Sequence, residues 1–104
     1  MKQHITPKQM QEITKEQFYG LFNGEGIVKR KDWASFHCKK MNIGKLFELL
    51  KDKGCTYINP LFYPAIGWFW TIDVTFKDGT ENPQDQSKHD ELCDGLWTIL
   101  KQII

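Results

Sequence analysis

The feature that most constrains this chain is the alternation of residue types in IGWFWTIDVTFKDG, residues 66–79. One alternate set is wholly apolar: Trp68, Trp70, Ile72, Val74 and Phe76. The other set is mainly polar: Phe69, Thr71, Asp73, Thr75 and Lys77. Because successive side chains of a strand point to opposite faces, the pattern predicts a half-buried strand of an antiparallel sheet. Both tryptophans are then expected in the core and Phe69 on the open face, which argues against an aromatic platform for stacking bases. If the Trp70 face is buried, changing Trp70 to alanine should cost about 3–5 kcal/mol.

Two capping signatures lie near the start of the chain, TPKQ at 6–9 and TKEQ at 14–17. In each, the threonine can accept a backbone hydrogen bond and the glutamine can return one. We therefore expect two short helices, at about residues 7–12 and 15–22, with proline at the first helical position of the first one. Asn23-Gly24 should end the second helix, since glycine tolerates positive φ.

The segment 25–41 is ambiguous, because its start suits a short strand or a loop while Asp32 can cap a helical turn. Residues 42–54 are clearer. Asn42 is a good cap, Gly54 a good terminator, and the apolar residues between them recur at helical spacing. A central helix is expected there.

The end of the chain predicts a sheet followed by a helix. Residues 55–59 form a β-prone run, Pro60 and Pro64 bound a predicted loop, and Asp78-Gly79 signals a tight turn before a brief return strand at 80–82. Ser87 can cap a last helix, within which Gly95 would allow close packing against the sheet. The apolar stripe of that helix consists of Leu92, Cys93, Leu96, Trp97, Leu100, Ile103 and Ile104.

These elements predict one α+β domain spanning residues 1–104: N-terminal short helices, a central helix, a small antiparallel sheet and a C-terminal helix packed on one sheet face. No apolar run is long enough for a membrane span, and no secretion signal precedes the first helix. Three cysteines without CxxC spacing favour reduced thiols in a bacterial-type or host cytoplasm.

The net charge is only +1, but it is unevenly distributed. Residues 29–53 carry eight basic groups against three acids, and residues 54–104 carry three basic groups against seven acids. We therefore expect two candidate contact faces. The basic face, with two possible aromatic anchors, consists of Lys29, Arg30, Lys31, Trp33, Phe36, Lys39 and Lys40. The acidic edge consists of Asp73, Asp78, Glu81 and Asp85, and Phe69 is a further contact candidate on the open sheet face.

Two blocks carry a family resemblance: His37, Lys39, Lys40, Ile43, Gly44, Glu48 and Leu50 in the first, and Glu91 to Trp97 in the second. They resemble the HKK-x-T-I-G and E-L-C-D-A-L-W patterns of small, uncharacterised accessory proteins carried by prophages of Gram-positive bacteria. The chain departs from these patterns at Cys38, at Asn42 in place of threonine and at Gly95 in place of alanine. The resemblance implies a phage accessory protein, many of which inhibit host defence systems such as CRISPR nucleases.

No sequence feature indicates catalysis, a metal or a cofactor. His89 and Cys93 have helical i, i+4 spacing but lack a second ligand pair, and His37, Cys38 and Asp32 match a nucleophile set in type alone. We therefore expect no enzyme, no metal site and no cofactor. The leading hypothesis is a binding protein that blocks a host macromolecule, with a defence nuclease such as a Cas protein as the favoured partner. The alternatives are a nucleic-acid-binding accessory protein and a sponge for a nucleotide signal.

Overall fold

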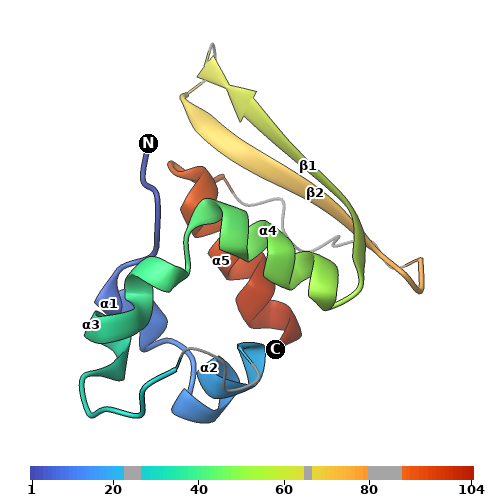
Figure 1. Cartoon of the computed structure of the whole chain (residues 1–104). Helices are drawn as coiled ribbons and strands as arrows, with labels where there is room; N and C mark the ends of the chain where they lie inside the picture. The colour runs from blue at the N-terminus through green and yellow to red at the C-terminus, as the bar shows by residue number, and fades with distance from the viewer. Residues whose placement is uncertain (23–26, 65–66, 80–87) are drawn as a thin grey trace.

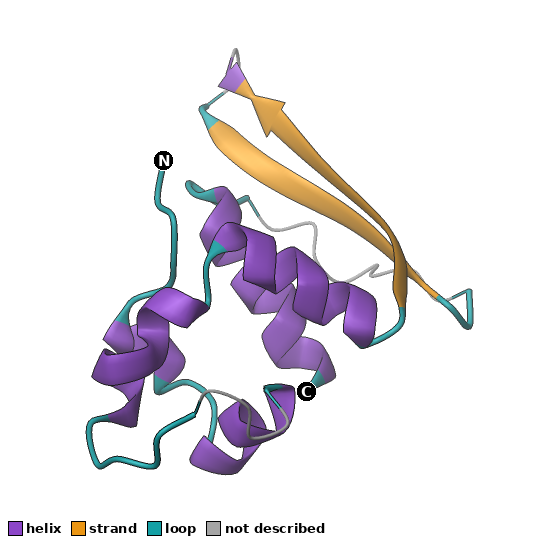
Figure 2. Ribbon diagram, in the orientation of Figure 1, coloured by secondary structure: helices purple, strands orange, loops and turns teal. Residues whose placement is uncertain are grey.

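The short N-terminal helices, the central helix, a two-stranded antiparallel sheet and the C-terminal helix follow one another as the sequence predicts. The computed structural model describes residues 1–22, 27–64, 67–79 and 88–104. Figures 1 and 2 show the two strands as a long ribbon across α4 and α5, with α1, α2 and α3 gathered on the far side of those helices. The elements are α1 (Pro7–Met10), α2 (Lys15–Leu21), α3 (Trp33–His37), the 3-10 helix η1 (Cys38–Lys40), α4 (Ile43–Asp52), β1 (Cys55–Tyr63), β2 (Phe69–Phe76) and α5 (Leu92–Ile103).

Both predicted capping boxes are present. The Thr6 hydroxyl accepts from the Gln9 backbone N–H at 3.1 Å, and the Gln9 side chain accepts from the Thr6 N–H at 2.9 Å. Thr14 and Gln17 repeat the arrangement at 3.1 and 2.8 Å. Each box satisfies N–H groups that a helix start leaves unpaired, so helices of one and two turns can form here. α1 is shorter than predicted, and the predicted stop at Asn23-Gly24 lies outside the described residues.

The ambiguous segment before α4 is a loop followed by α3 and η1. Asp32 occupies the position before α3, but its side chain makes no capping bond, because it binds Arg30 instead. Asn42 caps α4 as predicted, accepting from the Lys45 N–H at 2.8 Å. Gly54, at φ +96°, then turns the chain from α4 into β1.

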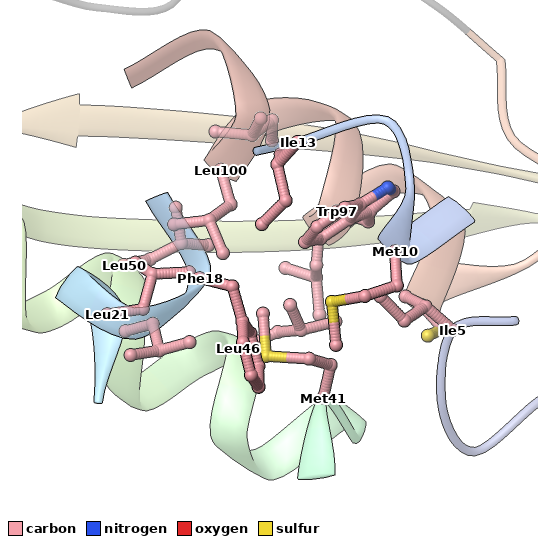
Figure 3. Close-up of a cluster of buried hydrophobic side chains, with 14 of the residues drawn as sticks. Ile5, Met10, Ile13, Phe18, Leu21, Met41, Leu46, Leu50, Trp97 and Leu100 are labelled. Atoms are coloured by element: carbon pink, nitrogen blue, oxygen red, sulfur yellow. The ribbon is translucent and has the colours of Figure 1, made fainter. Parts of the chain in front are cut away.

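One core joins the N-terminal segment to α4, α5 and the inner face of the ribbon. Figure 3 shows Trp97 and Leu100 of α5 facing Ile13 and Met10, with Phe18 and Leu46 beside them. The largest fully enclosed side chains are Trp97, Phe18, Ile5, Met10, Met41, Leu46, Leu49, Leu50, Ile72, Leu96, Ile99 and Leu100. The C-terminal helix contacts β2, as predicted, and it also contacts α4.

The close approach of α5 to the ribbon depends on Gly95. A Cβ atom there would lie 2.6 Å from Ile72 Cδ1 and 3.1 Å from the His89 ring. Since carbon atoms in contact lie about 3.5–4.0 Å apart, only glycine fits without a shift of its neighbours. This confirms the close packing that the sequence predicts at Gly95.

β1 extends further than the sequence predicts, since it runs through Pro60 to Tyr63. The predicted loop at 61–63 is therefore wrong. Trp70 of β2 exchanges two backbone hydrogen bonds with His89, on the side away from β1. Backbone groups in an antiparallel strand point alternately to either side, so Ile72 and its partner Pro60 also form a non-hydrogen-bonded pair. Proline is tolerated there because its missing N–H would have pointed away from the partner strand.

The predicted division of the aromatic residues between two faces is correct for only part of β2. Ile72 and Val74 are buried on the inner face, and Trp70 and Phe76 are half-buried. Trp68, however, is 71% exposed, so its predicted core position is wrong. The strand begins at Phe69, and Trp68 lies in the preceding turn at φ +57°, where the alternation no longer applies. That left-handed conformation costs an L-residue about 1–2 kcal/mol.

Phe69 lies on the outer face but is only 9% exposed, so it is not an open contact residue. Its ring stacks on Tyr63 at 5.2 Å, and Lys88 Nζ lies 4.8 Å from its centroid. Beyond β2, Gly79 takes φ +85° in the predicted turn. The predicted return strand at 80–82 and the Ser87 cap lie outside the described residues, and Glu91 is the residue before α5.

Candidate binding surface

The basic residues form two groups along the chain. Lys29, Arg30 and Lys31 lie in the loop before α3, whereas Lys39 and Lys40 lie in η1 at the other end of that helix (Figure 1). All five side chains are exposed. α3 has five residues and is about 7.5 Å long, so one phosphate backbone could reach both groups.

Arg30 is already occupied by groups of its own chain. Its Nε donates to Asp32 Oδ1 at 2.6 Å, its Nη2 donates to Oδ2 at 3.2 Å, and its guanidinium carbon lies 4.4 Å from the Phe36 ring centroid. The hydrogen bond between the two side chains lowers the pKa of Asp32 and raises that of Arg30. Asp32 uses two of the five N–H donors of this guanidinium, and its carboxylate would repel a phosphate that approached the others.

The two predicted aromatic anchors of the basic face differ. Trp33 is 7% exposed, and the centroid of its ring lies 5.4 Å from that of Phe18. It therefore belongs to the core and cannot be an anchor. Phe36 is 49% exposed and remains accessible beside Arg30. Lys29 Nζ lies 5.7 Å from the Tyr19 ring.

The predicted acidic edge can be followed over only half of its residues. Asp73 is exposed in the middle of β2, opposite Asn59, and Asp78 is exposed in the turn beyond the strand. Glu81 and Asp85 lie outside the described residues. The two described carboxylates therefore lie in different elements.

The β-ribbon carries a cluster of exposed aromatic residues that the sequence analysis missed. In the described chain eight large hydrophobic side chains are exposed, and five of them belong to the ribbon and its connecting turn: Tyr57, Leu61, Phe62, Tyr63 and Trp68. We call these five the ribbon surface. They divide between two faces, since Tyr63 stacks on Phe69 on the outer face, whereas Phe62 packs against Trp70 and Trp68. The aromatic residues themselves are evident in the LFY run at 61–63 and at Trp68. However, Pro60 and Pro64 predict a loop at 61–63, and the alternating pattern predicts a core position for Trp68.

At the hairpin end of the ribbon an open groove of about 450 Å³ is lined by Met1, Phe62, Trp68, Trp70, Asp90 and Glu91. We call it the tip groove. Three segments meet there, because Trp70 pairs through its backbone with His89 and the Lys2 backbone N–H donates to Glu91 Oε2 at 2.9 Å. A second hollow, of about 600 Å³, lies at the opposite end of β2 and is lined by Asp52, Lys53, Gly54, Phe76, Lys77, Asp78 and Ile103.

The residues weighed for metal binding or catalysis lie mostly in the core. Cys93 is fully buried, and burial raises the pKa of its thiol to about 11, which disfavours the thiolate that a metal or an electrophile needs. Cys38 and His37 are also buried. Within the described residues, no three histidine, cysteine or acidic side chains are grouped so as to hold a metal ion.

Across the described ranges no helix has the length and apolar character needed to cross a bilayer. No protein-family model, curated protein or solved structure matches this chain. The resemblance to prophage accessory proteins therefore stays an expectation, and the proposals below rest on the residues themselves.

Proposed function

We propose that this chain is a small non-enzymatic binding protein that acts by covering a surface of another macromolecule, with the ribbon surface as its contact face. The observation that supports this is the concentration of exposed aromatic side chains on the β-ribbon. Contiguous exposed apolar patches are uncommon on proteins that bind nothing, and they often indicate interaction sites.

The chemistry of the ribbon surface suits a protein partner. Tryptophan and tyrosine are enriched among the residues that dominate binding energy at protein interfaces. Trp68, Tyr57 and Tyr63 are of these types, and each has few rotatable bonds to immobilise on binding. The ribbon holds Tyr57 and Tyr63 on paired backbone, which reduces the ordering cost of association.

The resemblance to prophage accessory proteins narrows the partner within this proposal. We place the chain in the host cytoplasm and propose a host defence protein as its target, with a Cas-type nuclease as the specific version. Inhibition would then be steric, because a protein that covers a substrate channel needs no catalytic group of its own.

A nucleic-acid-binding role is the second candidate, favoured by the exposed Lys31, Lys39 and Lys40 near Phe36. Against it, the carboxylate of Asp32 lies beside Arg30 and would repel a phosphate. At the tip groove, the carboxylates of Asp90 and Glu91 would repel a phosphate backbone. The nucleotide-sponge alternative meets the same repulsion there.

The test uses the immobilised protein in host lysate, followed by a nuclease assay on whatever purified protein it captures. We expect a partner bound at submicromolar concentration, whose nuclease activity falls when the wild-type chain is added. Trp68→Gly should abolish both effects while preserving the fold, since glycine suits positive φ at this position.

Phe36→Ala is the matched control, because Phe36 is an exposed aromatic residue away from the ribbon. It should bind the partner as the wild type does. Capture that depends on Phe36 and not on Trp68 would move the interface to α3. Absence of any stable partner at micromolar concentration, together with a salt-sensitive gel shift that Lys31→Ala weakens, would favour nucleic acid instead.

A further inference from the structure

We propose that the tip groove receives the positively charged side chain of an arginine or lysine on the partner protein. This inference rests on the proposed function, because it names the chemistry of the partner at one end of the ribbon surface. It depends on the arrangement of three aromatic rings and two carboxylates around one hollow.

The rings form walls that meet at an angle. The Phe62 ring lies 4.9 Å from the Trp70 ring at an interplanar angle of 41°, and 6.1 Å from the Trp68 ring at 68°. Aromatic faces carry partial negative charge, and a cation within about 6 Å of a ring centroid is attracted to that face, most strongly for tryptophan. The three rings are in contact with one another and line the groove together, so a cation in the groove could lie against more than one of them.

The groove also carries formal negative charge. Asp90 is exposed, and Glu91 is fixed in place by the Lys2 backbone N–H. Lys2, whose backbone binds Glu91, directs its side chain elsewhere, since Lys2 Nζ lies 2.6 Å from Asp94 Oδ1 and 2.7 Å from Gln9 Oε1. Among the described residues, neither Asp90 nor Glu91 forms an ion pair. A positively charged side chain in the groove would therefore lie near two carboxylates that form no ion pair among the described residues.

Several other aromatic rings of the chain form cation–π contacts with its own lysine or arginine side chains. The described residues form four such contacts: Lys29 with Tyr19, Arg30 with Phe36, Lys45 with Phe22 and Lys88 with Phe69. Within the described ranges, no lysine or arginine lies over Phe62, Trp68 or Trp70. The tip groove thus combines three aromatic rings with two carboxylates, and no lysine or arginine of the described residues lies over those rings.

The backbone conformation of Trp68 also supports a binding site at the groove. A bulky residue with φ of +57° is a conformational outlier, and such outliers persist where the surroundings hold them and often occur at ligand-binding positions. Here the Trp68 N–H donates to the Tyr63 carbonyl at 3.0 Å, after Gly67 at φ +142°. Since the ring remains 71% exposed, little packing within the described chain compensates the strain.

A protein side chain fits the setting better than a free small cation. The groove is open and shares Phe62 and Trp68 with the ribbon surface, so a polypeptide could place one basic side chain against the rings while neighbouring parts of it cover these two exposed side chains. A small cation would use only the groove and would leave the neighbouring apolar side chains in water.

The test is a titration of the whole chain with two capped tripeptides, Gly-Arg-Gly and Gly-citrulline-Gly, which differ in charge but hardly in shape. Indole N–H resonances in ¹⁵N NMR give the readout, because the chain has four tryptophans. We expect saturable shifts at Trp68 and Trp70 with the arginine peptide, and unchanged resonances for the buried Trp33 and Trp97. The citrulline peptide should bind at least tenfold more weakly.

The double variant Asp90→Asn, Glu91→Gln should weaken the arginine peptide at least tenfold, whereas Asp73→Asn, which removes a carboxylate from the outer ribbon face, should have no effect. Equal binding of the citrulline peptide would overturn the proposal. So would stronger binding of free tetramethylammonium than of the arginine peptide, which would indicate a small-molecule site.

The same variants separate this inference from the proposed function. Suppose that Trp68→Gly abolishes capture of the partner while Asp90→Asn, Glu91→Gln leaves it intact: the ribbon interface would then stand and the cation assignment would be wrong. If no partner is captured but the arginine peptide binds as described, the groove assignment stands and the proposed function fails.

Discussion

Trp97 and Trp68 show how differently one residue type is used in this chain. Trp97 is 1% exposed in the centre of the core, and its indole N–H donates to Glu12 Oε1 at 2.9 Å (Figure 3). Trp68 is 71% exposed in a strained turn. Burying an aromatic ring stabilises a fold by removing a large apolar area from water, so only the first of these residues contributes to stability in that way.

We therefore predict that Trp97→Ala lowers the free energy of unfolding by about 3–5 kcal/mol. Trp68→Ala should change it by less than about 0.5 kcal/mol, as is usual for surface positions. Trp70 is half-buried, so the free energy of unfolding lost in Trp70→Ala should lie between the losses in these two variants. It should therefore be smaller than the loss expected from the sequence. Urea denaturation followed by circular dichroism measures all three variants. A loss at Trp68 as large as that at Trp97 would mean that the hairpin end is part of the core.

At the scale of elements, the contact between α5 and β2 determines how the ribbon sits on the helices. Gly95 allows this contact at the expense of helix propensity, which is about 1 kcal/mol lower for glycine than for alanine. Ile72 Cδ1 occupies the space that an alanine Cβ would need. Ile72 and Gly95 thus depend on each other across two elements.

We predict that Gly95→Ala fails to stabilise the protein, because overpacking costs about 1–3 kcal/mol and offsets the gain in propensity. Gly20→Ala in α2 is the matched control. Its Cβ would meet no atom within 4 Å, so it should stabilise the fold by about 0.5–1 kcal/mol.

Ile72→Val removes the interfering methyl group and should restore part of the benefit of alanine at position 95. A double-mutant cycle in urea should show favourable coupling of about 1 kcal/mol. Additive effects of the two substitutions would indicate that α5 moves away from the ribbon to accept the new methyl group.

At the scale of the whole molecule, polar contacts tie the N-terminal segment to α5. Lys2 Nζ and the Gln9 side chain both reach Asp94 Oδ1, at 2.6 and 2.8 Å. Glu12 Oε1 accepts from Trp97 and from Lys101 Nζ, at 2.9 Å each. The first dozen residues are thereby bound to the last dozen, and the core lies between them.

These contacts predict acid sensitivity. Burial acts to raise the pKa of Asp94, but hydrogen bonds from Lys2 and Gln9 outweigh burial and lower that pKa. The pKa of Glu12 is also lowered, because hydrogen bonds from Lys101 and Trp97 outweigh the effect of burial. A carboxyl group with a lowered folded-state pKa stabilises the fold above its unfolded-state pKa of about 4, and this contribution is lost as the pH falls through the folded-state value. The free energy of unfolding should therefore decline progressively below about pH 5.

Asp94→Asn and Glu12→Gln should each make this acid decline shallower, because the removed group no longer takes up a proton on unfolding. Glu16→Gln, on the exposed side of α2, is the control and should leave the slope unchanged. Thermal unfolding between pH 3 and 7 measures the slopes. Identical slopes for the wild type and both variants would contradict the role of these contacts.

Much of the fold could be predicted because the signals that specify it are local. Thr6, Thr14 and Asn42 begin helices through bonds to residues only three positions away, and the apolar stripe of α5 depends on spacing alone. The candidate sites were harder to predict. Whether Trp33 is an anchor or a core residue, and whether Arg30 is free, depends on neighbours that spacing does not reveal.

The sequence by itself determined the helix starts, the alternation in β2 and the order of the elements, because each follows from contacts along a short stretch of chain. Tertiary structure alone decided where that alternation ends. It placed Pro60 at a pair that needs no N–H bond, let β1 continue to Tyr63, and put Trp68 outside the strand. The physical reason is that pairing and burial depend on which segments meet in space: His89 pairs with Trp70, and Phe62, Trp68 and Trp70 then surround a groove with Asp90 and Glu91 instead of filling the core.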